Sequence, residues 1–180
     1  MRKYWLISAI LLLLMLIPEI DAEQSLQEIY IQAGGYAGYD KYIELNPDSS
    51  YVGDLYISDG VKVFIDGHGA LIYGQPYYTS IHVWGSILDI SHCVIYGGYN
   101  GIFFDTLSAG TINSNTVVGC NNIGISVIYQ DLSEDAEIWD NIITDCRVGF
   151  LCLENWHPRY IGYNTVYGME SYRYAELCPD

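Results

Sequence analysis

The chain has 180 residues, a formal net charge of −15 at pH 7, and 18 tyrosines against four phenylalanines. This length suffices for one domain with a core of its own. The acidic excess repels nucleic acid and anionic lipid, and it makes unaided binding to polyanions such as pectate less favourable.

The first 22 residues have the pattern of a secretory signal peptide. Arg2 and Lys3 precede an apolar segment of about 13 residues (5–17), which Pro18 ends. That segment is shorter than the roughly 20 residues that span a bilayer. We therefore predict a secreted, periplasmic or cell-surface protein whose mature domain covers residues 23–180. Membrane contact is expected only through an uncleaved signal segment.

The segment from Glu23 to Ser58 is less regular and is predicted to be an N-terminal capping coil. Residues 28–31 alternate like a first strand, and residues 42–45 and 55–57 are further predicted strands. The end of a stacked structure has to hide its open edge, so atypical sequence is expected there.

From residue 90 onward a short phrase occurs four times, with isoleucine first, Cys or Asn fourth, and Ile or Val sixth. Its fourth positions are separated by 22, 26 and 23 residues and are Cys93, Asn115, Asn141 and Asn164. A second apolar phrase recurs at intervals of 21, 23 and 25 residues, beginning at Ile81, Ile102, Ile125 and Phe150. A period in the low twenties indicates stacked units.

Two architectures have such a period, a leucine-rich horseshoe and a parallel β-helix. The horseshoe needs a leucine frame and a helical half in each repeat, whereas this frame is Ile and Val in short runs. Short β-branched runs separated by Gly, Asn and Asp are strand signals. Coils stacked about 4.8 Å apart can hydrogen-bond to the coils above and below. We therefore predict an all-β parallel β-helix, in which a coil is one circuit of the chain.

Asn115, Asn141 and Asn164 are predicted to form a structural ladder. Asn tolerates the left-handed backbone of a sharp corner, and its amide can hydrogen-bond to neighbouring backbone or to the Asn one coil away. Cys93 takes this place in the first of these coils, where a small buried thiol fits.

The other cysteines raise the question of disulfides, because the chain is predicted to be exported. Cys120 and Cys146 each follow the ladder by five residues and are expected to stack, so a bridge between them is a candidate. Cys152 is predicted to be a buried thiol, and Cys178 has no evident partner.

Alternation along the second phrase assigns inward and outward side chains. The inward set is Ile81, Val83, Ile102, Phe104, Ile125, Val127, Phe150 and Cys152. The outward set forms two columns, His82, Phe103, Ser126 and Leu151, then Trp84, Asp105, Ile128 and Leu153. Loops leave the strands after this sheet at residues 129–135 and 154–159, and such loops commonly carry function.

Residues 61–74 contain Val63-x-Ile65-Asp66-Gly-x-Gly-Ala-x-Ile72-x-Gly. This run and the later repeats resemble the right-handed parallel β-helix repeats of the pectin lyase-like superfamily, from residue 29 to the C-terminus. The resemblance implies a right-handed solenoid. It also favours a domain that is incomplete at its C-terminal end, where further coils of a longer chain or a capping partner would cover the open edge.

The same resemblance implies where an active site would lie, on the outward face of the sheet that holds the second phrase. Polygalacturonase-like members carry paired aspartates there, and these motifs do not occur here in the required order. Pectate lyase-like members use a Ca²⁺-binding acidic cluster and an Arg base, whereas the outward columns here offer Asp105 alone. Gly67-His68-Gly69 matches the letters of a Gly-His-Gly motif of the polygalacturonase-like members, but it lies in the early turn and not after paired carboxylates. Its glycines are explained by turn geometry.

The best remaining constellation for chemistry is His82, Trp84, Phe103 and Asp105 on two neighbouring coils. Aromatic faces flanked by polar groups are how proteins hold sugars, and His82 beside Asp105 could also be an oriented general base. The alternative is that these are ordinary strand aromatics lying under a loop. A second candidate group for sugar contact is Trp156, His157 and Arg159.

A Ca²⁺ site is conceivable at Asp131, Glu134 and Asp135, which crowd one loop with oxygen ligands, although solvated charge explains them too. Three functions therefore stay open. The first is an exported protein that contacts polysaccharide through its outward sheet and loops. The second is a polysaccharide lyase or glycoside hydrolase, and the third is a structural or adhesive surface module without catalysis.

Overall fold

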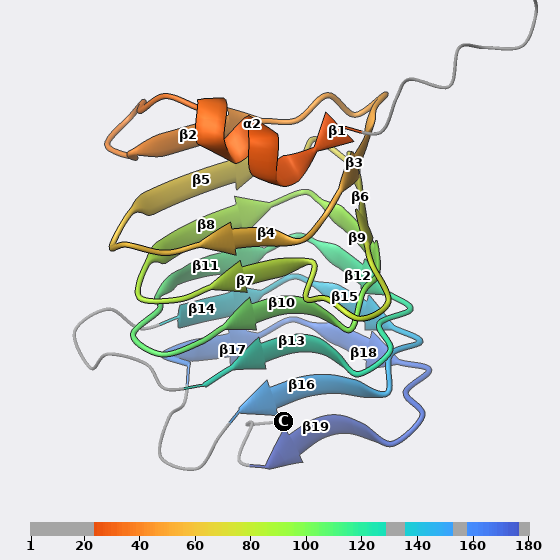
Figure 1. Cartoon of the computed structure of the whole chain (residues 1–180). Helices are drawn as coiled ribbons and strands as arrows, with labels where there is room; N and C mark the ends of the chain where they lie inside the picture. The colour runs from red at the N-terminus through yellow and green to blue at the C-terminus, as the bar shows by residue number, and fades with distance from the viewer. Residues whose placement is uncertain (1–23, 129–135, 153–157, 177–180) are drawn as a thin grey trace, which may run out of the picture.

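The structure is a computed structural model that describes residues 24–128, 136–152 and 158–176, with side chains up to residue 172 in the last of these segments. The chain forms a parallel β-helix, and each coil passes through three sheets in turn (Figure 1). The pairings between strands of successive coils are parallel. The predicted fold is confirmed.

Each sheet collects one strand from every coil. Sheet I contains β2 (Lys41–Glu44), β5 (Lys62–Asp66), β8 (Ile87–Ser91), β11 (Gly110–Asn113), β14 (Ala136–Trp139) and β17 (Tyr160–Gly162). Sheet II contains β1 (Gln24–Ser25), β3 (Ser50–Val52), β6 (Leu71–Gly74), β9 (Val94–Gly97), β12 (Thr116–Val118), β15 (Ile142–Thr144) and β18 (Thr165–Tyr167). Sheet III contains β4 (Leu55–Ile57), β7 (Ile81–Val83), β10 (Asn100–Phe104), β13 (Ile123–Val127), β16 (Val148–Cys152) and β19 (Tyr172–Glu176).

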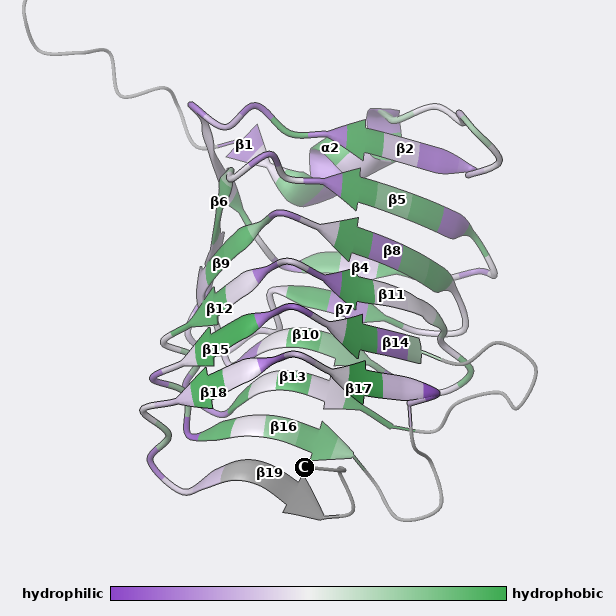
Figure 2. Ribbon diagram, turned by 180° about the vertical axis from the view of Figure 1, so that it is seen from behind, coloured by the Kyte–Doolittle hydropathy of each residue, from purple (hydrophilic) through white to green (hydrophobic). Residues whose placement is uncertain are grey.

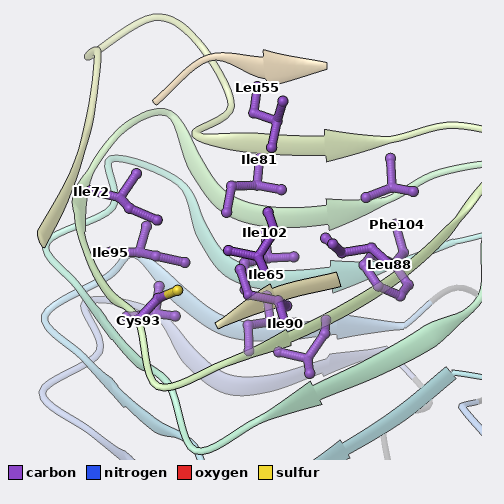
Figure 3. Packing of buried hydrophobic residues seen from close by; sticks show 14 of the residues in the cluster. Leu55, Ile65, Ile72, Ile81, Leu88, Ile90, Cys93, Ile95, Ile102 and Phe104 are labelled. Atoms are coloured by element: carbon purple, nitrogen blue, oxygen red, sulfur yellow. The ribbon is translucent and has the colours of Figure 1, made fainter. Parts of the chain in front are cut away.

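The core is a set of vertical files of aliphatic side chains between the three sheets. Leu55, Ile81 and Ile102 are aligned by strand register and form one file, which Figure 3 shows beside the pair Ile72 and Ile95. All five are fully buried. Hydrophobic and hydrophilic residues alternate along many strands of sheets I and II (Figure 2), as expected when one face of a strand meets the core. All eight residues predicted to point inward from sheet III are buried.

The asparagine ladder lies at the corner between sheets I and II. The backbone N–H of Asn115 donates to Asn141 Oδ1 at 3.0 Å, and that of Asn141 donates to Asn164 Oδ1 at 3.0 Å. The side-chain amides continue the column, from Asn115 Nδ2 to Asn141 Oδ1 and from Asn141 Nδ2 to Asn164 Oδ1. Cys93 is buried above them, and its N–H donates to Asn115 Oδ1 at 3.0 Å. The three asparagines therefore stack on successive coils, as the repeat predicts.

The left-handed backbone at this corner belongs to the residue before each asparagine. Ser114, Asp140 and Tyr163 have φ of 56°, 55° and 56°, and His92 before Cys93 has φ of 55°. Our prediction that the asparagines themselves take this conformation was wrong. The physical reason is that the ladder amide has to point into the stack, while the left-handed residue turns its own side chain toward solvent.

Cys120 and Cys146 stack as expected but are not bridged. Both are free and buried, and the N–H of Cys120 donates to Cys146 Sγ at 3.4 Å. The thiols donate to backbone carbonyls, Cys120 to Gly97 at 3.3 Å and Cys146 to Thr144 at 3.4 Å. A disulfide needs a specific torsion about its S–S bond, and cysteine side chains stacked in register on parallel coils seldom have it.

Cys152 also departs from the prediction. It is buried, but it is disulfide-bonded and not a free thiol. Cys178 lies outside the described residues. An inward position in the repeat therefore predicts that a cysteine is buried, but it does not predict its covalent state.

The N-terminal cap is a helix and not the strand predicted for residues 28–31. In α2 (Leu26–Gln32), Ser25 caps the first turn by accepting the N–H of Glu28 at 3.3 Å. Leu26 is fully buried, and Ile29 and Tyr30 pack on the core at helical spacing. The helix contacts the first strand of each sheet, β1, β2 and β4, and lies across the end of the stack (Figure 1). In the described part of the chain, no helix is long and apolar enough to cross a membrane.

Gly110 is one of the glycines that permit the close approach of neighbouring coils. Gly110 opens β11 with φ of 123°, and a Cβ there would meet the carbonyl oxygen of Leu88 on the coil above. We expect Gly110→Ala to destabilise the fold by about 3 kcal/mol, because it adds backbone strain and overlap with backbone atoms. Urea unfolding followed by circular dichroism measures this loss. Gly34→Ala is the control, since a Cβ there meets nothing within 4 Å; equal losses in both variants would contradict the prediction.

Candidate functional site

Strand register on sheet III brings one outward side chain from each coil into a single column. The pairings between β4, β7, β10, β13 and β16 align Tyr56, His82, Phe103, Ser126 and Leu151. Tyr56 is exposed, His82, Phe103 and Leu151 are half-buried, and Ser126 is buried. The buried Ser126 therefore separates the accessible side chains of the first three coils from Leu151.

These three coils present a continuous aromatic surface. The His82 imidazole stacks on the Phe103 ring with centroids 4.9 Å apart and an interplanar angle of 23°. Tyr56 meets the other side of His82 edge-on, with centroids 5.1 Å apart. We call Tyr56, His82 and Phe103 the aromatic column.

Asp105 fixes the orientation of His82. His82 Nε2 lies 3.2 Å from Asp105 Oδ2, and both side chains are about a quarter exposed. Asp105 Oδ1 accepts the N–H and the hydroxyl of Thr106 at 2.6 and 3.0 Å. A neutral imidazole that donates from Nε2 leaves Nδ1 as an acceptor. The pair predicted from sequence is therefore formed, with its carboxylate already engaged by three donors.

Trp84 belongs to the neighbouring outward column with Asp105. Its side chain is 47% exposed. Backbone pairing places the two residues on successive coils, because Asp105 N–H donates to the carbonyl of Val83 and Trp84 N–H to that of Ile57. Trp84 therefore adds a further exposed ring close to the aromatic column.

A pocket of about 240 Å³ opens beside the aromatic column. It is lined by Tyr56 and His82 of the column together with Asp54, Leu55, Tyr77, Tyr78 and Thr79. Sequence reasoning missed Asp54, Tyr56, Tyr77 and Tyr78. Tyr56 could have been found, since it lies at the middle of a predicted strand like His82, but the other three lie in aperiodic connections.

A larger hollow of about 510 Å³ lies at the corner between sheets I and II, where Asp66, His68, His92, Ser114 and Thr116 are among its lining residues. Both imidazoles already face the carboxylate of Asp66, with His92 Nδ1 at 3.1 Å and His68 Nε2 at 3.7 Å. The residues that line this hollow include no tyrosine, tryptophan or phenylalanine, so we place the candidate site on sheet III.

Of the other residues predicted for sugar or calcium binding, Arg159 lies in the described part of the chain, and it does not join this site. Arg159 is exposed, with its Nε 3.8 Å from Glu137 Oε1. Trp156 and His157 lie outside the described residues, as do the calcium candidates Asp131, Glu134 and Asp135. Among the residues that the structure describes, no group of three or more His, Cys, Asp or Glu side chains is arranged to hold a metal ion.

The arrangement on sheet III is chemically suited to holding a ligand. Glycoside hydrolysis uses two carboxyls, about 5–5.5 Å apart for retention or about 6.5–9.5 Å apart for inversion. Among the described side chains of the two outward columns, Asp105 is the single carboxylate, and Thr106 and His82 already occupy both of its oxygens. What the face does present is stacked rings flanked by polar groups.

A family model described as a right-handed beta helix region matches residues 46–173. No curated protein and no solved structure matches the chain.

Proposed function

The chain belongs to the right-handed β-helix family, and from that premise we propose that it is an exported protein that binds polysaccharide through the aromatic column of sheet III. The observation that carries the proposal is the stack of His82 between Tyr56 and Phe103, with Asp105 at its edge. Aromatic rings supply apolar area for the faces of sugar rings, and fixed polar groups bond their hydroxyls. Export is supported by the signal-peptide pattern of residues 1–22.

A lyase is the second candidate, and one observation favours it. His82 is oriented by Asp105, and such an imidazole can act as a general base within hydrogen-bond reach of a substrate proton. Among the described side chains of the outward columns, Asp105 is the single carboxylate, and this argues against a hydrolase. A structural or adhesive module without a glycan ligand is the third candidate, for which the exposed rings would be ordinary surface.

The test is binding and product release measured on one preparation of residues 23–180. We expect binding on an array of neutral, acidic and amino-bearing polysaccharides, and no release of reducing ends or unsaturated products. If unsaturated products are released, and if His82→Ala abolishes their release, the protein is a lyase and the proposed binding function is replaced by that activity. Absence of both binding and release would reject both sugar-related functions and leave the structural module.

A further inference from the structure

The pocket beside the aromatic column has features that a surface for neutral sugar alone does not need. Its wall comes from two strands, β4 and β7, and from the two connections that precede them, β3 to β4 and β6 to β7. Tyr56 and His82 belong both to the pocket and to the column. A glycan lying on the column would therefore extend directly into the pocket.

Three tyrosine rings surround this pocket and stay open to solvent. The exposed fractions are 45% for Tyr56, 88% for Tyr77 and 60% for Tyr78. The π-face of a tyrosine attracts cations as well as apolar surface. Such a ring cluster around a carboxylate is the arrangement that recognises alkylammonium groups.

Asp54 is the carboxylate of this pocket, and one of its oxygens has no partner. The N–H of Gln75 hydrogen-bonds the carboxylate, but Oδ1 is buried without a hydrogen bond within the described part of the chain. No Lys or Arg forms an ion pair with it there. Burial raises the pKa of Asp54, more than the Gln75 hydrogen bond lowers it. Asp54 also has a left-handed backbone, with φ of 64°.

A carboxylate held in this way lowers the stability of the free protein. Burying a charged oxygen without a donor is unfavourable, and so is a left-handed conformation at a residue other than glycine. The pKa of Asp54 is higher in the folded protein than in the unfolded chain. The protonated carboxyl therefore contributes fully to the free energy of unfolding below the unfolded pKa, and this contribution is lost as the pH rises through the folded pKa. At neutral pH the Asp54 charge therefore opposes folding, which is typical of a group retained for a ligand.

The loop that carries two of the tyrosines is held in place by the next coils. Tyr99 N–H donates to the carbonyl of Tyr78 at 2.7 Å, Asn121 Nδ2 to that of Pro76 at 3.0 Å, and Asn100 Nδ2 to Thr79 Oγ1 at 3.1 Å. The pocket is therefore formed before a ligand arrives, which reduces the entropic cost of binding.

We propose that the Asp54 pocket takes the protonated amino group of an amino sugar, so that the polysaccharide bound on sheet III carries free amino groups. This inference rests on the proposed function and narrows its ligand. The ammonium group would donate to the Asp54 carboxylate and lie against Tyr56, Tyr77 and Tyr78. The net charge of −15 attracts such a polycation and repels uronates.

Calorimetry with three β-1,4-linked oligomers of equal length tests the inference: glucosamine, N-acetylglucosamine and glucose. At about pH 6 a free carboxyl is ionised and an amine is protonated. We expect the glucosamine oligomer to bind at least about tenfold more tightly than the other two, because a hydrogen bond between charged groups is a strong one. Equal affinities for all three would overturn the inference while leaving the proposed function in place. If none of the three oligomers binds and no polysaccharide on the array binds, the proposed function itself is rejected.

Asp54→Asn is the decisive variant, because Asn tolerates the left-handed backbone and removes only the charge. We expect it to lose the preference for the amine, to keep its affinity for the glucose oligomer, and to unfold at the same or a higher temperature than the parent. Asp59→Asn is the matched control, since Asp59 also has a positive φ, of 73°, but lies outside the pocket. Retention of the amine preference by Asp54→Asn would overturn the inference. Competition by spermidine to the same extent as by the glucosamine oligomer would show an ammonium site that does not require a sugar, and would overturn the amino-sugar assignment.

Discussion

Asn141→Ala is expected to lower the free energy of unfolding by about 4 kcal/mol, which is a large part of the 5–15 kcal/mol that holds a typical domain folded. The Asn141 amide donates to the carbonyls of Ile112 and Trp139 and to Asn164 Oδ1. Its Oδ1 accepts from both the backbone and the side chain of Asn115. Alanine would leave these groups buried and unpaired, and each unpaired group carries the cost of its desolvation.

Two further variants show whether this loss belongs to the ladder. Asn164→Ala should cost less, because Asn164 is half-buried and at the last described rung. Asn113→Ala should be nearly neutral, because its half-exposed side chain has no hydrogen bond within the described residues. Urea unfolding followed by far-UV circular dichroism gives the three values. Equal losses at Asn141 and Asn113 would show that the column is not what stabilises this corner.

Phe103→Ala is expected to weaken polysaccharide binding by about tenfold to a hundredfold, with the fold retained. Its ring forms the flat support of the aromatic column, stacked on His82 at 4.9 Å. Covering an aromatic side chain is worth about 1.5–3 kcal/mol, and this contribution is lost when the ring is removed. The measurement is calorimetric titration with the best ligand from the array.

Phe64→Ala is the matched control for this binding loss. Phe64 is half-buried like Phe103 and stacks on Tyr42 with centroids 5.0 Å apart and an interplanar angle of 19°, but it lies on sheet I. Both variants should lose similar stability, and the Phe64 variant should keep its affinity. A similar loss of affinity in both variants would mean that sheet III is not the binding face.

The repeat determines which side chains meet the core. In Ile81-His82-Val83 and Ile102-Phe103-Phe104, a strand pattern leaves the middle residue outside, and the repeat places these middle residues in one column. His82 and Phe103 therefore stack, and Asp105, two residues further along, reaches His82. This part of the site follows from periodicity alone.

Departures from the predictions occur where local alternatives are nearly equal in energy. Residues 28–31 alternate as a strand would, yet Ser25 can cap a helix there, and the open end of the stack is covered better by the apolar face of α2. At the ladder corner, several residue types tolerate a positive φ, so composition does not show which one adopts it. Only the direction in which the buried amide points decides that.

The sequence by itself determined the architecture, the inward and outward faces and the pairing of His82 with Asp105. Each of these depends on the repeat, because residues one repeat apart become neighbours when the coils stack. The tertiary structure alone decided the pocket. Asp54, Tyr77 and Tyr78 lie in connections between strands, where no period operates, and they meet only because the register of sheets II and III brings two such connections together. Long-range register depends on how all the coils stack, so the sequence of either connection does not predict it.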